Sequence, residues 1–396
     1  MSCSICEYAG ISGGYPSGEH RINGIGDEVN TVNCGARRRR RAENYKPALC
    51  MCGAVIGGLV MRNRLAVVFA ALAIIAALAV GASSAAPKKV AYIINGALGD
   101  LSFYDSGQAG IDRIAKDFKV QTRTIECNFD PAKYPQALQA AIQWNADAIF
   151  VISYGYEDLL MQYADQYPTK YWVNVDTVVE NKKKTITSVD FVEEEGAFMA
   201  GVVAGLVTTD TSIRGVNPDK VIGAVGGEDD PVIRSFIYGY EQGAKYIDKD
   251  IEVKTVFAGT WDDPVRGKQA AKQLYSQKAD IVFQIAALTG SGVLEAAREE
   301  GKYAIGVDSN QNPLQPGHVV TSDLKNVGDA IYGVFKTIVD GTYKPGVVLE
   351  YGLKEGGVGL AIDEHTEKIL PAKSLQRVLE IQEKVKSGQI KVKRYQ

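Results

Sequence analysis

The chain has 396 residues, of which 46% are hydrophobic and 23% charged, and its formal net charge at pH 7 is −3. This composition is that of a globular protein long enough for two domains. Because the chain has no net positive charge, composition gives no support to a nucleic-acid-binding function. Five of the 6 cysteines lie in residues 1–52, so the remainder of the chain, with Cys127 alone, cannot form an internal disulfide.

Residues 1–60 show no sustained hydrophobic periodicity and contain a run of arginines from Arg37 to Arg41. We interpret them as a disordered extension that results from a mis-assigned start codon, with Met61 as the true first residue. The alternative is a zinc site built from the thiolates of Cys3, Cys6, Cys50 and Cys52. Their spacing differs from that of the common zinc ribbons, which disfavours this alternative.

Residues 61–86 have the three parts of a secretory signal peptide. A basic head precedes an apolar stretch from Leu65 to Val80, and a tail of small residues follows. The stretch is near the lower length limit for crossing a bilayer, so a retained membrane anchor is the alternative to cleavage. The arginines before it predict that Pro87 and the residues after it lie on the extracytoplasmic side of the membrane.

From residue 90 onward, predicted strands and helices alternate. Short apolar runs predict buried strands at 90–94, 148–152, 171–175, 221–225, 281–286 and 303–307. Helical spacing predicts helices from Phe103 and at about 131–145, 156–166, 191–208, 231–247, 264–277 and 291–301. This alternation indicates parallel sheets covered by helices on both faces. The elements are too many for one small sheet, so we expect two sheets with a break at 208–220.

Several residues follow predicted strands at the edge where open α/β sheets bind ligands. The loop after the first strand carries a carboxylate, Asp100, and an aromatic ring, Phe103, and the strand at 303–307 is followed by Asp308. The loop Thr289–Gly292 opens a helix with small residues whose bare backbone N–H groups suit a phosphate or a hydroxyl. A tight packing turn is the alternative there. We expect a ligand held between the two sheets.

Eight short segments between residues 88 and 362 carry a family resemblance. They are Gly99–Ser106, Glu193–Gly201, Val225–Phe236, Gly259–Pro264, Thr289–Gly292, Gly306–Gln311, Thr321–Lys325 and Gly356–Leu360. The first is similar to the D-D-K-S-F-N motif of the basic membrane protein family of ABC-transporter substrate-binding proteins. The best understood members of that family are purine-nucleoside receptors. Each segment alone is a weak signal, but eight in order and with fitting spacing are specific.

The resemblance implies an α/β fold of the type I periplasmic-binding-protein class, with two doubly wound parallel-sheet lobes joined by a hinge. We expect residues 88–207 and about 322–342 in lobe 1, and about 220–320 and 343–396 in lobe 2. Helical spacing from Pro371 predicts a helix packed on the lobes, whereas 391–396 are expected to contribute little. The resemblance also implies a monomeric extracytoplasmic receptor that presents its ligand to an ABC permease, without cofactor or metal.

The resemblance further implies which residues bind the ring of a ligand. Phe103 and Trp261 would enclose a purine ring between them. Asp100 and Asp176 would face the base or shape its end of the cleft. Tyr104, also assigned to the site, stands where nucleoside receptors carry an asparagine, so an amide that both donates to and accepts from a purine edge is absent.

The ribose part of the site is implied in the same way. Asp308 and Lys325 would bind the ribose hydroxyls, and Gly290 would supply backbone contacts. Departures from the family motif at Gly99 and Leu101 touch the base-reading end and spare the stacking and ribose groups. Nucleoside-like binding is therefore the primary expectation and a purine the favoured base, with a flavin or a sugar as the alternative ligand.

Two other functional classes were weighed. His20, His318 and His365 are the only histidines, and none lies in a recognisable catalytic pattern. A nucleoside-processing enzyme would need a metal on clustered acids such as Glu228–Asp230 or Asp262–Asp263, which we expect to be solvated or to cap helices. A cytoplasmic regulator would need a DNA-binding helix pair before residue 88, where the signal peptide stands instead. We therefore expect a binding protein and not an enzyme.

Overall fold

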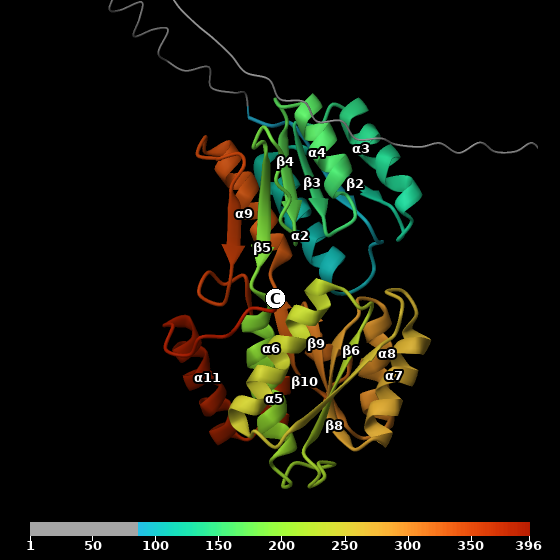
Figure 1. The fold of residues 1–396 in the computed structure, drawn as a ribbon, viewed down its shortest axis with the longest axis vertical. Coiled ribbons are helices and arrows are strands. Elements are labelled where there is room, and N and C mark those ends of the chain that lie inside the picture. The colour runs from blue at the N-terminus through green and yellow to red at the C-terminus, as the bar shows by residue number, and fades with distance from the viewer. Residues whose placement is uncertain (1–85) are drawn as a thin grey trace, which may run out of the picture. The chain divides into compact units, whose positions relative to one another are not determined.

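The computed structural model of the chain describes residues 86–396, which contain two six-stranded sheets within one compact unit (Figure 1). The predicted extension, start site, zinc site and signal peptide lie outside the described residues, apart from Ala86. Among residues 86–396, no helix is both long and apolar enough to cross a membrane. We call each sheet together with the helices that pack on it a lobe.

Lobe 1 contains a sheet in which all strands are parallel, in the order β11-β5-β4-β3-β1-β2. Its strands are β1 (Lys89–Ile94), β2 (Gln121–Glu126), β3 (Ala148–Ile152), β4 (Tyr171–Val175), β5 (Ile186–Phe191) and β11 (Val348–Tyr351). Its helices are α2 (Phe103–Phe118), α3 (Tyr134–Gln143), α4 (Glu157–Gln166) and α9 (Val327–Val339), with a 3₁₀ turn at Pro131–Lys133. The helices cover both faces of the sheet, α3 and α4 on one and α2 and α9 on the other.

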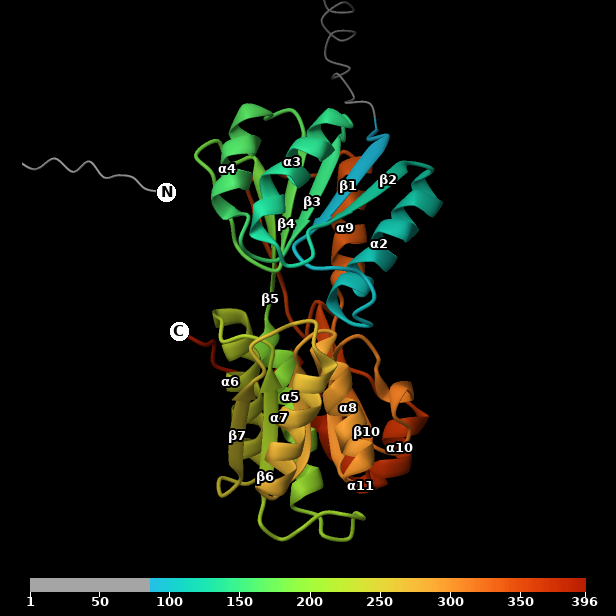
Figure 2. The same ribbon diagram turned by 90° about the vertical axis from the view of Figure 1, so that its right-hand side faces the viewer.

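Lobe 2 repeats this plan with the order β12-β10-β9-β8-β6-β7, in which only β12 runs antiparallel to its neighbour. Its strands are β6 (Val221–Gly226), β7 (Glu252–Phe257), β8 (Ala279–Ile285), β9 (Tyr303–Asp308), β10 (Val319–Lys325) and β12 (Val358–Leu360). Its helices are α5 (Glu193–Thr208), α6 (Pro231–Ile247), α7 (Pro264–Ser276), α8 (Thr289–Glu299), α10 (Glu364–Ile369) and α11 (Ala372–Lys386), with a 3₁₀ turn at Asn312–Leu314. Figure 2 shows α7 and α8 in front of this sheet, with α5 behind them.

The central strands are buried on both faces, which is why they read as continuous apolar runs. In β1, Ala91 and Ile93 pack toward α3 and α4, whereas Tyr92 and Ile94 pack toward α2 and α9. Burying one such side chain fully contributes about 1.5–3 kcal/mol. The two-sheet, parallel α/β architecture predicted from the sequence is confirmed.

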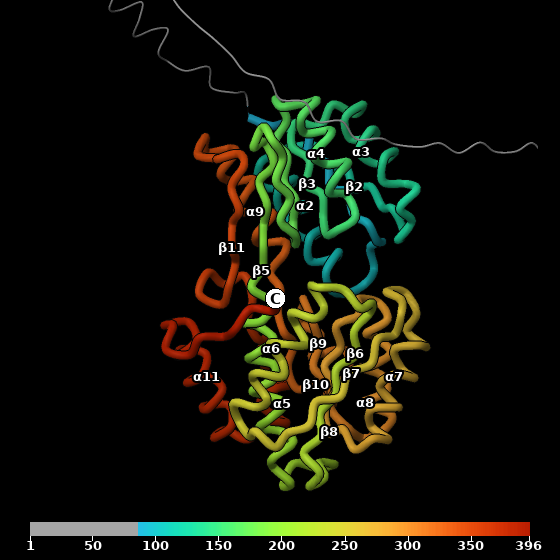
Figure 3. Tube along the Cα trace, in the orientation of Figure 1, coloured from blue at the N-terminus to red at the C-terminus, as the bar shows by residue number. Residues whose placement is uncertain are grey.

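The chain passes between the lobes three times, after β5, after β10 and after β11 (Figure 3). These crossings differ from the lobe boundaries that the sequence suggested. Helix α5, expected in lobe 1, packs on α6 and β10 of lobe 2, and residues 322–325 belong to β10 in the same lobe. Strand β11, expected in lobe 2, pairs with β5 of lobe 1. The expected break at 208–220 therefore lies inside lobe 2. Hydrophobic periodicity predicts that an element is buried but not which sheet it joins.

Helices α5 and α6 approach each other unusually closely, because glycines face the partner helix. A Cβ at Gly201 would lie 2.0 Å from the carbonyl oxygen of Tyr240, and a Cβ at Gly243 would lie 1.9 Å from that of Phe198. Real Cβ atoms do not approach backbone so closely, so any larger residue would push the helices apart. This packing fixes α6 against the start of α5 at the crossing after β5, where a Cβ at Gly239 would lie 2.4 Å from the carbonyl oxygen of Glu194.

The C-terminal residues contact both lobes, contrary to the expectation that 391–396 contribute little. The Arg394 guanidinium forms ion pairs with Asp190 of β5 at 3.3 Å and with Glu194 of α5 at 3.2 Å. The backbone N–H of Tyr395 donates to Glu194 at 2.8 Å. Since the Glu194 side chain is only 2% exposed, Arg394 is the cation that compensates a buried carboxylate at the crossing after β5.

We expect Arg394→Ala to lower the free energy of unfolding by about 1–3 kcal/mol, because it leaves a buried carboxylate without its cation. The measurement is urea unfolding followed by circular dichroism. The control is Arg377→Ala on α11, whose ion pair with Glu380 is half exposed on both sides and contributes at most about 1 kcal/mol. Equal unfolding midpoints for the two variants would contradict this role of Arg394.

Candidate functional site

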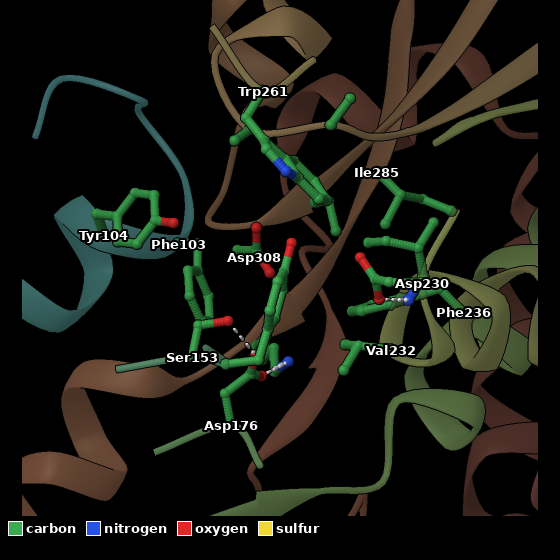
Figure 4. A pocket seen from close by; sticks show the side chains of 16 residues that line it. Phe103, Tyr104, Ser153, Asp176, Asp230, Val232, Phe236, Trp261, Ile285 and Asp308 are labelled. Atoms are coloured by element: carbon green, nitrogen blue, oxygen red, sulfur yellow. Dashed lines mark hydrogen bonds and ion pairs between the residues drawn. The ribbon is translucent and has the colours of Figure 1, made fainter. Parts of the chain in front are cut away.

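A cavity lies between the lobes, where the carboxyl ends of the strands of both sheets meet (Figure 4). It contains about 520 Å³ of space not occupied by atoms, part of it open to solvent. It is lined by Phe103, Tyr104, Ser153, Tyr154, Asp176, Asp230, Val232, Ile233, Phe236, Trp261, Ile285, Ala286, Ala287, Val307, Asp308 and Lys325. A cavity between two lobes with mostly apolar walls and a few polar groups suits a small organic molecule.

Two carboxylates occupy equivalent places in the two sheets. Asp176 follows β4, and Asp308 ends β9, which holds the matching position in the strand order of lobe 2. Both residues have positive φ angles, 92° for Asp176 and 63° for Asp308, as does Ser153 after β3 at 73°. Such conformations are uncommon for residues other than glycine and gather at ligand sites. The two lobes thus present similar polar groups to one cavity.

Aromatic rings reach the cavity from opposite lobes. Phe103 begins α2 of lobe 1, and Trp261 lies in the loop between β7 and α7 of lobe 2. The Trp261 ring packs against the backbone of Gly227, where a Cβ would come within 2.3 Å of the indole. The Trp261 carbonyl accepts a hydrogen bond from the Thr289 N–H at 3.1 Å. These contacts hold the indole in place, so two fixed rings are available for stacking.

Lys325 joins the lobes beneath the cavity. Its ammonium group forms ion pairs with Asp176 of lobe 1 and, at 2.8 Å, with Glu193 at the start of α5 in lobe 2. The lysine side chain is 2% exposed. Burial alone would lower the pKa of Lys325, but Asp176, Glu193 and Asp308 outweigh burial and raise it. The lysine therefore stays charged and holds two crossings of the chain together.

The same ammonium group lies near three phenyl rings. The Lys325 Nζ is 5.3 Å from the ring centre of Phe103, 5.1 Å from that of Phe191 and 5.4 Å from that of Phe236. Cation–π attraction of this kind contributes about 0.5–2 kcal/mol per ring. The Lys325 ammonium therefore helps to position these aromatic rings as well as the carboxylates with which it pairs.

Asp308 takes part in a second contact between the lobes. The Ser102 hydroxyl, just before α2, donates to the Asp308 carboxylate at 2.5 Å, and the Ser309 hydroxyl donates to the Ser102 carbonyl at 3.1 Å. The Gln311 side chain donates to the Leu101 carbonyl at 3.1 Å. Burial raises the pKa of Asp308 to about 7, against the opposing effects of Lys325 and the Ser102 bond. This carboxyl group can accept hydrogen bonds from ligand hydroxyls.

Six of the eight residues that the resemblance assigned to the site line the cavity. They are Phe103, Tyr104, Asp176, Trp261, Asp308 and Lys325. Tyr104 contributes its ring, while its hydroxyl donates to Asn95 at 2.7 Å. The sequence thus identified residues from five separate segments that the fold brings to one place.

Asp100 and Gly290 are not part of the cavity lining. The Asp100 carboxylate accepts hydrogen bonds from the backbone N–H groups of Ser102, Tyr104 and Asp105, and so it caps the helix that carries Phe103. The Gly290 N–H donates to backbone carbonyls at the end of β8, and a Cβ there would collide with the Gln284 side chain. Both residues support the wall of the site from behind.

Four lining residues with functional chemistry were not predicted. Ser153 and Tyr154 follow β3 directly, so the rule that selected Asp308 at the end of its strand also applies to them. Asp230 precedes Pro231 at the start of α6 and carried only the signal of a helix cap. Phe236 lies on α6, where the sequence pattern predicts that an aromatic residue belongs to the hydrophobic core.

Three of the acids in the clusters that an enzyme would require take part in ion pairs or helix caps. Asp229 pairs with Arg234, and Asp230 and Asp263 cap the helices α6 and α7. Within residues 86–396, no group of three or more His, Cys, Asp or Glu side chains is arranged to hold a metal ion.

Comparison with known proteins agrees with this geometry. Residues 87–396 match the Bmp family, described as the PnrA-like ABC transporter substrate-binding proteins. The chain belongs to this family. It is 33% identical to Basic membrane protein A of Borreliella burgdorferi over 277 residues, which covers 68% of this chain and 78% of the relative. It is 31% identical to Basic membrane protein D of Borreliella burgdorferi strain JD1 over 310 residues, covering 77% of this chain and 87% of the relative.

A solved structure supports the same assignment. The chain is similar to an ABC transporter solute-binding protein from Aeropyrum pernix K1, with a TM-score of 0.71 and 27% identity, covering 78% of this chain and 94% of that one. The resemblance to the basic membrane protein family and the type I periplasmic-binding fold are therefore confirmed. The family is one of substrate-binding proteins, which carry solutes to ABC transporters.

The raised pKa values predict how stability depends on pH. Burial raises the pKa of Asp308 to about 7, whereas an unfolded aspartate titrates near ~3.9. Between these values the folded protein binds more protons than the unfolded chain, so the free energy of unfolding falls as pH rises through this window. Asp308→Asn cannot ionise. We therefore expect it to reduce the loss of stability between pH 5 and pH 7.5 by about 1–3 kcal/mol.

Urea unfolding of both proteins at the two pH values measures this difference. Ser102→Ala serves as a second variant, because removing the hydroxyl that stabilises the ionised Asp308 raises the pKa of that carboxyl further. The loss of stability in this variant should extend to higher pH. If Asp308→Asn has the same pH dependence as the unaltered protein, Asp308 does not titrate in this range.

Proposed function

We propose that this protein is the extracytoplasmic receptor of an ABC importer and that it binds a nucleoside-like solute, with a purine nucleoside favoured, in the cavity between its lobes. The observation that carries the proposal is the position of Phe103 and Trp261. They reach one cavity from opposite lobes, beside the polar cluster of Asp308 and Lys325. A flat ring next to a group rich in hydroxyls is the ligand chemistry that matches this arrangement.

In this proposal the base stacks between the two aromatic rings. Stacking of a base on an aromatic side chain contributes about 1–3 kcal/mol. The ribose hydroxyls bind Asp308 and the ammonium of Lys325, and each hydrogen bond to a charged group contributes about 1.5–3 kcal/mol. Asp176 holds Lys325 in place for this contact. Asp100 and Gly290 act indirectly, by fixing the wall of the site.

The charges that line the cavity support a nucleoside over a nucleotide. Three carboxylates, Asp176, Asp230 and Asp308, line it together with one cation, Lys325, whose charge is already balanced by its ion pairs. A phosphate group would be repelled by the carboxylates, because like charges in a buried site disfavour each other strongly. The ligand is therefore expected to be uncharged or cationic.

Binding is coupled to closure of the lobes in this proposal. The ligand contacts Phe103 and Asp176 in lobe 1 and Trp261 and Asp308 in lobe 2, so its full set of contacts exists only when the lobes are together. A ligand stabilises the state that it binds better, and here that state is the closed one. The closed monomer then presents the solute to its permease at the outer face of the membrane.

Calorimetric titration of the purified protein, freed of carried-over ligand, with inosine, guanosine, adenosine, cytidine, riboflavin and ribose tests the proposal. We expect micromolar or tighter binding of a purine nucleoside, and we expect Trp261→Ala to weaken it about 5- to 150-fold through loss of stacking. The control is Trp144→Ala, which removes a tryptophan that stacks with Lys89 at 5.2 Å outside the cavity lining. A folded protein that binds riboflavin or ribose and no nucleoside would overturn the proposal.

A further inference from the structure

One oxygen atom at the cavity has no hydrogen-bond partner among the described residues. It is Oδ2 of Asp230, which is buried. The other carboxylate oxygen, Oδ1, accepts a hydrogen bond from the Ile233 N–H at 3.0 Å and so caps α6. This cap fixes the side chain, and Figure 4 shows the second oxygen turned away from the helix toward the interior of the cavity. The protein thus fixes a hydrogen-bond acceptor at the cavity without supplying a hydrogen-bond donor to it.

Among residues 86–396, no cation forms an ion pair with this carboxylate. The nearest arginine along the chain, Arg234, is paired with Asp229 through two hydrogen bonds of 2.5 and 2.6 Å. The charged groups that act on Asp230, Asp176 and Glu228, are themselves acidic. Apolar side chains of Val232, Phe236 and Ile285 line the same part of the cavity. In such surroundings an acceptor without a partner is destabilising, and a hydrogen-bond donor on the ligand removes this cost.

The position of Asp230 suits the base and not the ribose. It lies on the side of the cavity formed by α6 and the end of β8, whereas Lys325 and Asp308 form the polar cluster assigned to the sugar. An oxygen that only accepts hydrogen bonds distinguishes an N–H group from a bare ring nitrogen, because two acceptors repel each other. A site built around a fixed hydrogen-bonding group rejects ligands that lack its complement.

We propose that Asp230 Oδ2 accepts a hydrogen bond from an N–H group on the base, so that the receptor selects nucleosides whose base carries a donor on its edge. This inference rests on the proposed function. Inosine and guanosine have a ring N–H, whereas purine riboside has the same fused ring and sugar without any N–H on the base. Purine riboside therefore isolates the contribution of the donor from stacking and from the ribose contacts.

The test is Asp230→Asn, measured by calorimetric titration at pH 8. Asparagine caps a helix as well as aspartate does, so α6 keeps its first turn. The change replaces the free acceptor by an NH₂ donor. The unaltered protein should bind inosine and guanosine about 10- to 100-fold more tightly than purine riboside. The variant should lose most of this ratio through weaker binding of inosine and guanosine, with purine riboside changed by less than about threefold.

Asp263→Asn is the matched control. Asp263 also precedes a proline, Pro264, and caps α7 through the N–H groups of Val265 and Arg266, but it does not line the cavity. It should bind every nucleoside as the unaltered protein does. Thermal unfolding of both variants verifies that the caps are retained.

The outcomes separate the two proposals. If Asp230→Asn leaves the ratio between inosine and purine riboside unchanged, or weakens both equally, the role of Asp230 is overturned while nucleoside binding stands. If the unaltered folded protein binds none of the three nucleosides, the proposed function is overturned and the role of Asp230 with it.

Discussion

The ion pairs of Lys325 are the interaction on which the arrangement of the lobes depends. This lysine ends β10 at one crossing of the chain, and its partners Asp176 and Glu193 lie after β4 and at the crossing after β5. A buried cation without carboxylates would be severely destabilising, and so would the carboxylates without the cation. The fold therefore requires both lobes to meet at this point. The cavity lies at this junction, and so its polar groups are positioned by the same contacts that join the lobes.

Each lobe places similar chemistry at the matching position of its sheet. An aspartate with a positive φ angle follows β4 in lobe 1 and ends β9 in lobe 2, and each lobe contributes one stacking ring. A ligand between them satisfies groups from both halves at once. Asp230 breaks this correspondence, because the helix cap that holds it belongs to lobe 2 alone. In the proposed function the shared groups bind the features common to nucleosides, and Asp230 discriminates between bases.

The sequence predicted six of the twelve strands in residues 86–396 and most of the helices there, because these elements give a continuous apolar run or a clear helical period. It missed the internal strands β5 and β10, whose apolar residues are interrupted by polar ones. It also missed the edge strands β2, β7, β11 and β12, which are short or carry many polar residues, and the helices α9 and α10. The sequence analysis also assigned α5 to the wrong lobe. This helix is apolar on nearly every side, so its hydrophobic pattern does not indicate which sheet it packs on. Six of the eight predicted site residues line the cavity, because the family motifs lie at strand ends and in the loops that follow strands. Asp230 could not be predicted, because the sequence does not show that one oxygen of its carboxylate lacks a hydrogen-bond partner.

The three crossings of the chain between the lobes determine when each sheet can be completed during synthesis. The sheet of lobe 1 lacks its strand β11 until residue 351 has been made, and lobe 2 lacks β12 until residue 360. Neither lobe can therefore be completed from the first half of the chain while synthesis continues. The connectivity that forms the hinge thus also delays completion of both sheets until most of the chain has been made.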